Sequence, residues 1–398
     1  MPPLLRTISA ERYRALGVDV VTGHARLCDP WTVELTQADG QVRRLTARSI
    51  VLATGALPVV PPVPGLADVG FLTTETLWDA FAAREEPPAR LAILGAGPVG
   101  VELAQAFARL GSAVILIEAG PRVLGREDED VSAFARAALE AEGVRVLAGR
   151  TAVACGRDAD GRWIETDGAE GRLRVAFDEL IVAVGRQART AGFGLEELGI
   201  GTGRVIETND YLETIYPNIF VAGDAAGPWQ LTHAAAHQAW FAAVNALFGF
   251  AWRFRPDYRF LPRVTFLDPE IACVGLTEVE ARARGIGHEV TRLDLADLDR
   301  AIAEGAAVGF VKVLTVPGKD RILGVAIAGD HAGELLAEFV LAMRNGLGLG
   351  KILATVHSYP TMAEANRLVA GNWRRAHVGA RLLALMERVH RFRRGERG

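Results

Sequence analysis

The sequence predicts a mixed α/β chain, in which doubly wound parallel-sheet domains are followed by a separate α+β domain. Three observations carry this prediction. A strand, a glycine turn, a helix and a second strand follow one another between residues 91 and 118, which is the order of a βαβ unit. From Pro262 onward, strands and helices alternate without a glycine fingerprint, as in an α+β domain. The 398 residues allow two or three domains of roughly 150 residues each.

Composition and charge exclude several classes of protein. The longest uncharged apolar run, Ala239–Trp252, has 14 residues, whereas a membrane-spanning helix needs about 20. The first 20 residues contain three Arg and one Glu without an apolar core, so no secretory signal is expected. Cys28, Cys155 and Cys273 are far apart in the sequence, which argues against a disulfide framework or a zinc site and favours the reducing cytoplasm. The net charge of −4 argues against a nucleic-acid partner.

The N-terminal elements are expected to be short strands joined by turns. The expected strands are Val18–Thr22, Thr32–Leu35 and Ser49–Ala53. Asp39-Gly40 predicts a hairpin turn. The proline-rich residues 58–65 predict a rigid, extended crossing. A helix is expected at Thr76–Ala83, ended by the prolines that follow it.

The clearest stretch of the chain contains Gly95-x-Gly97-x-x-Gly100 between an apolar strand and a helix, and Glu118 closes the next strand. This context is typical of a dinucleotide fingerprint. Gly95 permits the tight turn, Gly97 allows a pyrophosphate to approach, and Gly100 lets the helix pack closely. Glu118 can accept hydrogen bonds from ribose hydroxyls and would repel a 2′-phosphate, which favours NAD over NADP. Arg122, four residues further on, could reduce this preference because its positive charge attracts a phosphate. The alternative is a glycine turn without a ligand.

The remaining elements continue the α/β pattern and then change to the α+β domain. Up to residue 261 we expect a helix at Val131–Glu142, strands at Val144–Leu147 and Glu179–Val184, a hairpin at Asp158–Gly161, two strands within 205–223 and a helix at Ala234–Phe248. In the last domain we expect strands at 264–275, 288–295, 308–316 and 321–328, and helices at 277–284 and 332–345.

A second motif ends an apolar strand with an acid. Ile219–Ala222 runs directly into Gly223-Asp224. A carboxylate at the carboxyl end of a parallel strand faces the ligand crevice of a doubly wound sheet. The alternative is a turn with a solvated aspartate.

Seven segments follow one another along the chain: Ala53-Thr54-Gly55, Gly95–Glu102, Val184-Gly185-Arg186, Thr214–Asp224, Leu231-Thr232-His233-Ala234, Asp268-Pro269-Glu270 and His357–Glu364. Together they resemble the motifs of the class I pyridine nucleotide-disulfide oxidoreductases, the family of dihydrolipoamide dehydrogenase, glutathione reductase and mercuric reductase. The resemblance covers the chain from about residue 15 to residue 372.

The resemblance implies an FAD-dependent oxidoreductase. Electrons would pass between NAD(H), with NADP(H) less favoured, and a disulfide, dithiol or metal substrate through the flavin. The implied domains are an incomplete FAD-binding domain (1–82 and 190–261), a complete NAD-binding domain (83–189), a dimerisation domain (262–372) and a basic tail (373–398). A homodimer acting on a small-molecule or protein disulfide is expected, and no resident metal.

The resemblance also implies roles for single residues. The nicotinamide nucleotide would lie against Gly95, Gly97, Gly100 and Glu118, with Glu102 beside the nicotinamide. Thr54, Gly55 and Gly185 mark the two crossovers between domains. For the flavin, the implied contacts are Gly223, Asp224, Thr232, His233 and Ala234. Tyr359, Glu364 and His357 would act at the disulfide site of the partner subunit. The alternatives are a packed histidine at 357 and an acid that suits a helix N-terminus at 364.

Two departures from the family pattern matter. Only 52 residues precede Ala53, and they contain no GxGxxG and no CxxxxC. We therefore expect a chain with impaired flavin binding and no disulfide-reductase turnover, and the alternative function is that of a non-catalytic NAD-binding dimer. Tyr359 stands where the dehydrogenases and glutathione reductase have their catalytic histidine. Mercuric reductases have a tyrosine near this place, but no cysteine follows Cys273 here to supply their C-terminal pair.

The last residues form a separate feature. Residues 373–398 contain eight Arg and two Glu, a net +6, which leaves −10 for residues 1–372. In residues 379–392 the apolar positions 382, 383, 385, 386, 389 and 392 gather on one helical face. Such a helix can make a weak contact with an anionic membrane surface over residues 379–394. Alternatively it packs on the dimer with its arginines in water.

Overall fold

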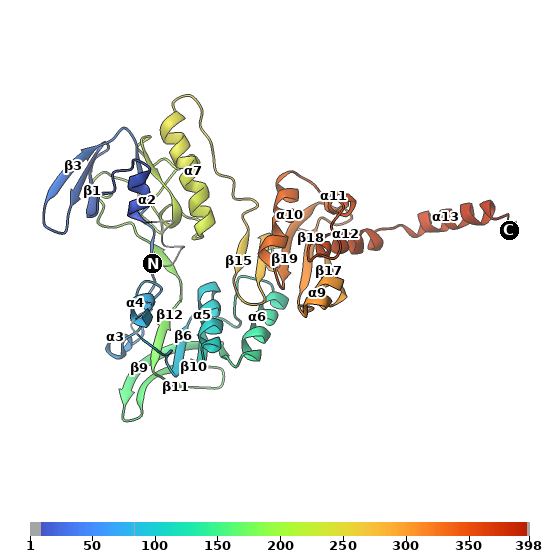
Figure 1. The fold of residues 1–398 in the computed structure, drawn as a ribbon, viewed down its shortest axis with the longest axis horizontal. Helices are drawn as coiled ribbons and strands as arrows, with labels where there is room; N and C mark the ends of the chain where they lie inside the picture. Colours follow the sequence, from blue (N-terminus) through green and yellow to red (C-terminus); the bar gives the residue numbers. More distant parts are fainter. Residues whose placement is uncertain (1–8, 83, 396–398) are drawn as a thin grey trace. The chain divides into compact units, whose positions relative to one another are not determined.

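The computed structural model describes residues 9–82 and 84–395. The chain divides into two compact units (Figure 1). The first combines residues 1–57 with 186–256, and the second combines residues 58–185 with 257–398. The predicted domain boundaries are not tested by this division and stay predictions.

The first unit begins with a helix and an antiparallel sheet. The elements are α2 (Ala10–Ala15), β1 (His24–Asp29), β2 (Thr32–Thr36) and β3 (Val42–Thr46). The hairpin expected at Asp39-Gly40 is confirmed, because β2 pairs with β3 and Gly40 has φ +82°. The strand expected at Val18–Thr22 is wrong. The amide of Val18 donates back to the carbonyl oxygen of Tyr13, so this stretch ends α2, and the first strand begins at His24.

Two strand pairs complete the first unit. β4 (Ile50–Leu52) pairs in parallel with β14 (Ile219–Val221), and β5 (Ala56–Pro58) pairs with β13 (Arg186–Ala188). β14 is the only strand within 205–223 in the described chain, where two were expected, since Thr202 and Ile206 form only an isolated bridge. Helix α7 (Thr232–Phe248) packs against both β14 and β4.

The second unit contains a parallel sheet of four strands. Their order is β12 (Glu179–Val182), β6 (Arg90–Leu94), β7 (Ala113–Glu118) and β8 (Arg145–Ala148). The strand–helix–strand unit expected at 91–118 is confirmed, with α5 (Pro98–Arg109) between β6 and β7. The expected helix after it is α6 (Glu129–Ala141).

Both faces of this sheet are covered, as the apolar runs of its strands require. Leu91 and Ile93 face a core that includes side chains of α5 and α6. Ala92 and Leu94 alternate to the other face, against an antiparallel sheet and a short helix. These elements are β9 (Arg150–Asp158), β10 (Gly161–Gly168), β11 (Leu173–Phe177) and α3 (Leu66–Val69). Helix α4 (Leu77–Ala82) lies within the expected Thr76–Ala83.

The rest of the second unit is an antiparallel sheet of five strands with helices. The order is β15 (Arg263–Thr265), β16 (Ile271–Gly275), β19 (Ile322–Ala328), β18 (Phe310–Thr315) and β17 (Glu289–Asp294). The single strand expected at 264–275 is wrong. The chain reverses direction after Thr265, so that β15 and β16 pair antiparallel with Thr265 opposite Ile271.

Helices cover one face of the five-stranded sheet. α10 (Ala332–Arg344), α11 (Leu349–Ala354) and α12 (Glu364–Ala376) share a core with its strands. Two shorter helices are α8 (Glu278–Ala283) and α9 (Asp299–Glu304). Residues of the other face, among them Cys273, Phe310 and Ala326, join the core of α5 and α6. This shared core explains why the parallel and the antiparallel sheets form one compact unit.

The chain ends in α13 (Ala380–Arg393). Its described side chains, from residue 383 onward, are exposed. In the part of the chain that the structure describes, no helix is both long and apolar enough to cross a membrane.

Candidate functional site

The glycine turn after β6 has a geometry that only glycine accommodates. Gly95 has φ +103°, and a Cβ there would lie 2.6 Å from the carbonyl oxygen of Ala183. A Cβ on Gly100 would strike the carbonyl oxygen of Gly95, so the close approach of α5 to the strand requires glycine. A Cβ on Gly97 would meet open space. Gly97 therefore serves no packing purpose in the chain, and it leaves the backbone accessible at the start of α5.

Glu118 binds this turn directly. Its Oε2 accepts a hydrogen bond of 2.7 Å from the amide of Ala96, and its Oε1 accepts one of 2.6 Å from the amide of Gly120. Each carboxylate oxygen can accept further hydrogen bonds. Glu118 thus fixes the glycine turn to the end of β7 and presents a negative charge at the same edge of the sheet.

The carboxyl ends of neighbouring strands meet at this edge. Gly185 follows β12, the strand beside β6, and the amide of Ala183 donates to the carbonyl oxygen of Leu94 at 2.8 Å. Gly185 has φ +137°, and a Cβ there would meet open space. The sheet therefore brings Gly95, Glu118 and Gly185 to one edge, where ligands of parallel α/β sheets bind.

Glu102 lies one turn into α5. It is half-buried, and its Oε1 accepts a 2.8 Å hydrogen bond from the amide of Phe266. Burial raises the pKa of this carboxyl, and the Phe266 amide offsets part of that rise. A carboxyl with a raised pKa in a partly buried place is typical of functional sites and also of structural contacts.

In the first unit, a second strand edge gathers four predicted residues. Thr54 and Gly55 follow β4, and Gly223 and Asp224 follow β14, which pairs with β4 in parallel register. The hydroxyl of Thr54 donates 2.7 Å to the carbonyl oxygen of Arg189. Gly55 and Gly223 have φ values of +71° and +76°. Both glycines thus turn the chain sharply at the same edge.

Asp224 has a partner that sequence reasoning missed. Its Oδ2 lies 3.4 Å from Nε of Arg186, and Nη2 of Arg186 donates 2.8 Å to the carbonyl oxygen of Ala56. Arg186 belongs to the Val-Gly-Arg segment, but nothing in the spacing indicated an ion pair across 38 residues. The carboxylate of Asp224 remains partly exposed at the strand end, so its other lone pairs are available to a polyhydroxyl group.

The start of α7 faces the same turn. Thr232 is the first residue of α7, followed by His233 and the buried Ala234. Gln238, one turn further, accepts a 2.7 Å hydrogen bond from the amide of Gly223 and donates one of 2.7 Å to the carbonyl oxygen of Gly227. Gln238 is fully buried and was not predicted. Its position among the apolar residues of α7 was the signal in the sequence that could have indicated a buried hydrogen-bonding role.

The C-terminal motif places its histidine in a paired, half-buried position. Nδ1 of His357 lies 3.0 Å from the carbonyl oxygen of Thr355, and Nε2 lies 3.1 Å from the carboxylate of Glu338 on α10. Asn366 donates 2.8 Å to the same carboxylate. Both ring nitrogens of His357 therefore have partners within the chain.

Tyr359 and Glu364 have other partners. The hydroxyl of Tyr359, a side chain that is 70% exposed, donates 3.1 Å to Oδ2 of Asp299. This hydrogen bond raises the pKa of Tyr359. The buried Glu364, at the start of α12, is 3.6 Å from Arg367. The three predicted catalytic side chains thus each contact a different residue, and the geometry does not test their catalytic role.

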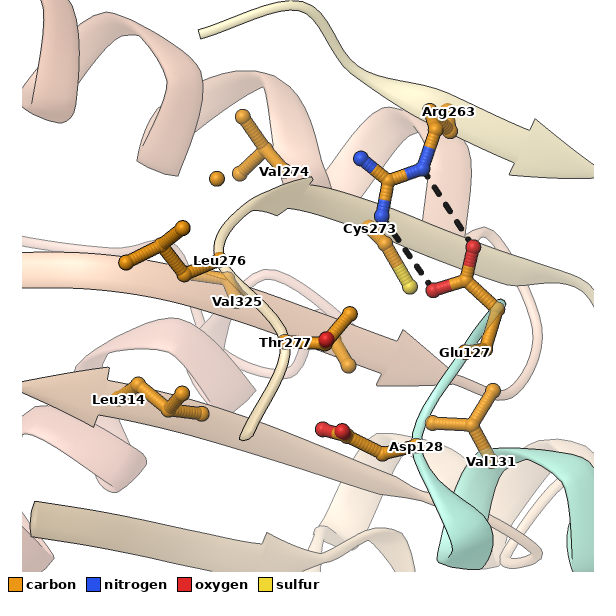
Figure 2. A pocket seen from close by; sticks show the side chains of 12 residues that line it. Glu127, Asp128, Val131, Arg263, Cys273, Val274, Leu276, Thr277, Leu314 and Val325 are labelled. Carbon is orange, nitrogen blue, oxygen red and sulfur yellow. Dashed lines mark hydrogen bonds and ion pairs between the residues drawn. The ribbon is translucent and has the colours of Figure 1, made fainter. Parts of the chain in front are cut away.

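A buried ion cluster joins β18 of the five-stranded sheet to the start of α6 and to α8. Nζ of Lys312, which is almost fully buried, lies 2.8 Å from Asp128, 2.6 Å from Asp130 and 3.1 Å from Glu278. Beside it, Arg263 lies 3.4 Å from Glu127, next to the thiol of Cys273 (Figure 2). The cavity there has a volume of about 10 Å³, which is room for about one water. The cluster is therefore a structural contact rather than a ligand site.

No group of three or more metal-ligating side chains occurs among the residues that the structure describes. The free cysteines are Cys28, which is half-buried, and the buried Cys155 and Cys273. Burial raises the pKa of Cys155 to about 11, so its thiol is protonated at neutral pH.

Residues 7–239 match the family described as pyridine nucleotide-disulphide oxidoreductase, and residues 261–370 match the dimerisation domain of the same family. The chain belongs to the pyridine nucleotide-disulphide oxidoreductases. The resemblance derived from the seven segments is therefore confirmed.

Relatives of the chain within this family are oxidoreductases. The chain is 36% identical to a dihydrolipoyl dehydrogenase of Thermus scotoductus over 359 residues, which are 87% of this chain and 73% of the relative. It is 34% identical to a mercuric reductase of Streptomyces lividans over 373 residues, 92% of this chain and 77% of the relative.

Solved structures agree on the fold. LpdA from Mycobacterium tuberculosis superposes with a TM-score of 0.81 and 25% identity, covering 94% of this chain and 82% of that one. The HOCl-induced flavoprotein disulfide reductase RclA from Escherichia coli superposes with a TM-score of 0.80 and 25% identity, covering 92% of this chain and 83% of that one.

The family assignment confirms the predicted α/β class and the predicted enzyme class, an FAD-dependent NAD(P)H oxidoreductase. FAD and a nicotinamide nucleotide are the cofactors of this family. The matched dimerisation domain supports a homodimer.

Proposed function

We propose that this oxidoreductase uses NADH in preference to NADPH, and that its kind of reaction passes electrons through a flavin to a disulfide, dithiol or metal substrate. Because the chain has no CxxxxC and no second GxGxxG, we expect weak flavin binding and no turnover with disulfides, and the acceptor experiment below tests this. The observation that carries the nucleotide preference is Glu118. Its carboxylate lies at the glycine turn, where the adenosine ribose of a dinucleotide binds in this kind of sheet. A negative charge there repels a 2′-phosphate and accepts hydrogen bonds from free ribose hydroxyls.

The residues of the second unit fit a nicotinamide nucleotide. Gly97 leaves the start of α5 open, so that backbone amides and the positive end of the helix can receive a pyrophosphate. Glu118 already holds the amides of Ala96 and Gly120, so the ribose acceptor is oriented before any ligand arrives. Glu102 lies on the same helix, at the expected place of the nicotinamide.

The residues of the first unit fit the sugar-alcohol chain of a flavin. Asp224 offers a carboxylate at a strand end, held by Arg186, and Gly55 leaves open space beside it. When bound, the nicotinamide supplies a hydride and the flavin relays the electrons to the acceptor. The chain's own contribution is to orient the two groups and to hold charge beside them. Thr232, His233 and Ala234 are proposed to line the flavin at the start of α7.

For the acceptor, we propose Tyr359 and Glu364 as the residues of this chain that contact it, with His357 as a positioning residue. The hydrogen bond to Asp299 keeps Tyr359 protonated, which makes it a donor rather than a base. Dihydrolipoyl dehydrogenase, mercuric reductase and a disulfide reductase are among the relatives. Their acceptors are chemically related, because disulfides and thiophilic metal ions both react with thiols. The three free cysteines suit a reducing, cytoplasmic location.

The test separates nucleotide binding from turnover. Calorimetry of the purified chain with NADH and with NADPH measures the preference without any need for flavin. We expect NADH to bind at least about tenfold more tightly, a difference of about 1.4 kcal/mol. Tighter binding of NADPH would contradict the role given to Glu118.

The second part of the test uses FAD and the acceptors. The chain is incubated with FAD, and the visible flavin absorbance is followed on addition of NADH and then of lipoamide, a disulfide dye or Hg²⁺. Bleaching by NADH and recovery with an acceptor would establish the family's reaction in this chain and identify the acceptor class, and recovery with lipoamide or the disulfide dye would contradict the expected lack of disulfide turnover. A chain that binds NADH yet gives neither signal would instead support a nucleotide-binding protein without turnover.

A further inference from the structure

The last helix of the chain has an apolar face that nothing in the described part of its own chain covers. In α13 (Ala380–Arg393), Leu385 is 55% exposed and Phe392 is 85% exposed, and Leu383, Met386 and Val389 are exposed as well. The preceding helix differs, since α12 buries Val369 and Trp373 in the core of the five-stranded sheet. The exposure is therefore a property of α13 and not of this end of the chain as a whole.

The exposed apolar side chains lie on one side of α13, and Arg388, Arg391 and Arg394 run from the border of that side around the rest of the helix, whereas Arg393 falls within the apolar side. Leu385, Val389 and Phe392 are spaced by four and three residues, which places them on one face of a helix with 3.6 residues per turn. Arg388, Arg391 and Arg394 are each three residues apart and lead from the border to the opposite face. The helix is thus amphipathic, with a basic polar face.

The length and charge of the segment indicate what the face contacts. The 14 residues of α13 extend for about 21 Å, which is too short to span a bilayer but suits a helix that lies in its surface. Residues 373–398 carry a net charge of +6. If α13 instead paired with acidic residues elsewhere in the chain, the charges of its arginines would be neutralised but its apolar face would stay exposed.

A second copy of the helix is a poor occupant for electrostatic reasons. Arg388 borders the apolar face, and Arg393 falls between Val389 and Met386 within it, so two copies packed face to face would bring arginines together. Glu387 is the one acid in the sequence of α13, and Arg391 already pairs with it at 2.7 Å. Anionic lipid headgroups complement the same arginines.

We propose that α13 anchors the protein to an anionic lipid surface. Leu385, Val389 and Phe392 would enter the boundary of the acyl chains, and Arg388, Arg391 and Arg394 would contact the headgroup phosphates. In a homodimer two such helices act together, so that the binding of one raises the effective concentration of the other. The surface would bring the oxidoreductase close to acceptors held at a membrane.

The experiment measures co-sedimentation of the full chain with large vesicles. One set is phosphatidylcholine alone and the other contains phosphatidylglycerol as well. We expect binding to the anionic vesicles, a loss of about tenfold or more on neutral vesicles, and weakening at high salt because the charges are exposed. Binding to neither set, or equal binding to both, would overturn the proposal.

Matched variants separate the two faces. Leu385→Gln combined with Phe392→Gln removes apolar contact without changing charge and is expected to abolish binding, whereas Ala384→Gln on the polar face is the neutral control. Arg388→Gln with Arg391→Gln is expected to remove the preference for anionic vesicles, and Lys at both positions should restore it. NADH binding, measured by calorimetry, confirms that each variant is folded.

Sedimentation velocity without lipid tests the competing occupant. If removal of residues 379–398 reduces the number of chains in the assembly, the face binds a second copy and the lipid proposal fails. If the number of chains is unchanged and vesicle binding is lost on removal, the proposal is supported.

Discussion

At the scale of single residues, Glu118 combines two tasks in one carboxylate. Its two oxygens hold the amides of Ala96 and Gly120 at 2.7 and 2.6 Å, and the same group is placed to read the ribose of a dinucleotide. Holding the turn leaves the carboxylate able to accept hydrogen bonds from a ribose, because each oxygen has further lone pairs. A substitution here therefore affects both the turn and the nucleotide.

We predict that Glu118→Ala lowers the affinity for NADH by about 10- to 100-fold, which corresponds to roughly 1.5–3 kcal/mol for a hydrogen bond to a charged group. The affinity for NADPH should fall less or rise, because the repulsion of its 2′-phosphate is removed. Calorimetry with both nucleotides gives the ratio. Glu140→Ala, an exposed acid near the end of α6, is the control and should change neither affinity.

Tyr359 allows a spectroscopic prediction. Its hydrogen bond to Asp299 raises its pKa above the ordinary value of 10.0. The neutral phenol is favoured in the folded chain, so the stabilising contact is complete below pH 10.0 and is lost as the pH rises through the raised value. The ultraviolet difference between the original chain and Tyr359→Phe should show one tyrosine titrating above free tyrosine.

The control for this prediction is Asp299→Asn. It removes the charge that faces the phenol, so the titration of Tyr359 should return toward that of free tyrosine. An unchanged titration in this variant would mean that the contact with Asp299 does not exist in solution.

At the scale of elements, the ion cluster around Lys312 connects β18 to the start of α6 and to α8. Burial by itself raises the pKa of Asp128, but the hydrogen bond and charge of Lys312 and the amides of Glu278 and Val279 outweigh it, so the pKa is lowered. For Lys312, burial lowers the pKa and its contacts with Asp128 and Asp130 outweigh that effect and raise it. The charged forms of Asp128 and Lys312 therefore stabilise each other in the cluster.

We predict that Lys312→Met lowers the free energy of unfolding by about 3–5 kcal/mol, since it leaves buried carboxylates without their cation. Lys319→Met, at an exposed lysine in the turn before β19, should change it by less than about 0.5 kcal/mol. Chemical denaturation of the two variants beside the original chain measures the difference. A loss in Lys312→Met no larger than that of the control would contradict the buried cluster.

The same cluster predicts a pH dependence with two sides. The lowered pKa of Asp128 gives stability that is present above 3.8 and is lost as the pH falls through the lower folded value. The raised pKa of Lys312 gives stability that is present below 10.5 and is lost as the pH rises through the higher folded value. Lys312→Met should flatten both sides in denaturation experiments that span this range.

At the scale of the whole molecule, the matched dimerisation domain supports an assembly of two chains. Several large apolar side chains of residues 262–372 are exposed in the single chain, namely Phe266, Leu341, Leu347 and Val356, of which Val356 is 94% exposed. An isologous interface of a homodimer buries the same patch twice, and these side chains are its candidates.

We predict that sedimentation velocity gives twice the chain mass of 42.7 kDa at micromolar concentration. Leu341→Glu combined with Val356→Glu should shift the chain toward the monomer, because a charge in a desolvated apolar interface is costly. Leu247→Glu, an exposed leucine at the end of α7, is the matched control and should leave the dimer intact. A monomer in the original chain would contradict the prediction.

Much of this organisation follows from local pattern. In residues 91–118 an apolar run, a glycine turn, a helical pattern and a second apolar run follow one another, and β6, α5 and β7 occur there. The meeting of Thr54 with Asp224, and of Gly95 with Gly185, also follows from the sequence, because carboxyl ends of parallel strands share one edge. The seven segments sufficed to predict the family.

Contacts between distant residues needed the fold. Arg186 with Asp224, His357 with Glu338 and Lys312 with Asp128 join residues that no periodicity relates. The reversal between β15 and β16 had a local signal, since Asp268-Pro269-Glu270 separates the two strands, and the expected single strand ignored it. Hydrophobic periodicity reports which side of an element is buried, whereas the identity of a partner depends on how elements pack. The sequence therefore predicts the elements and edges of this oxidoreductase, and packing alone selects the charged partners at its sites.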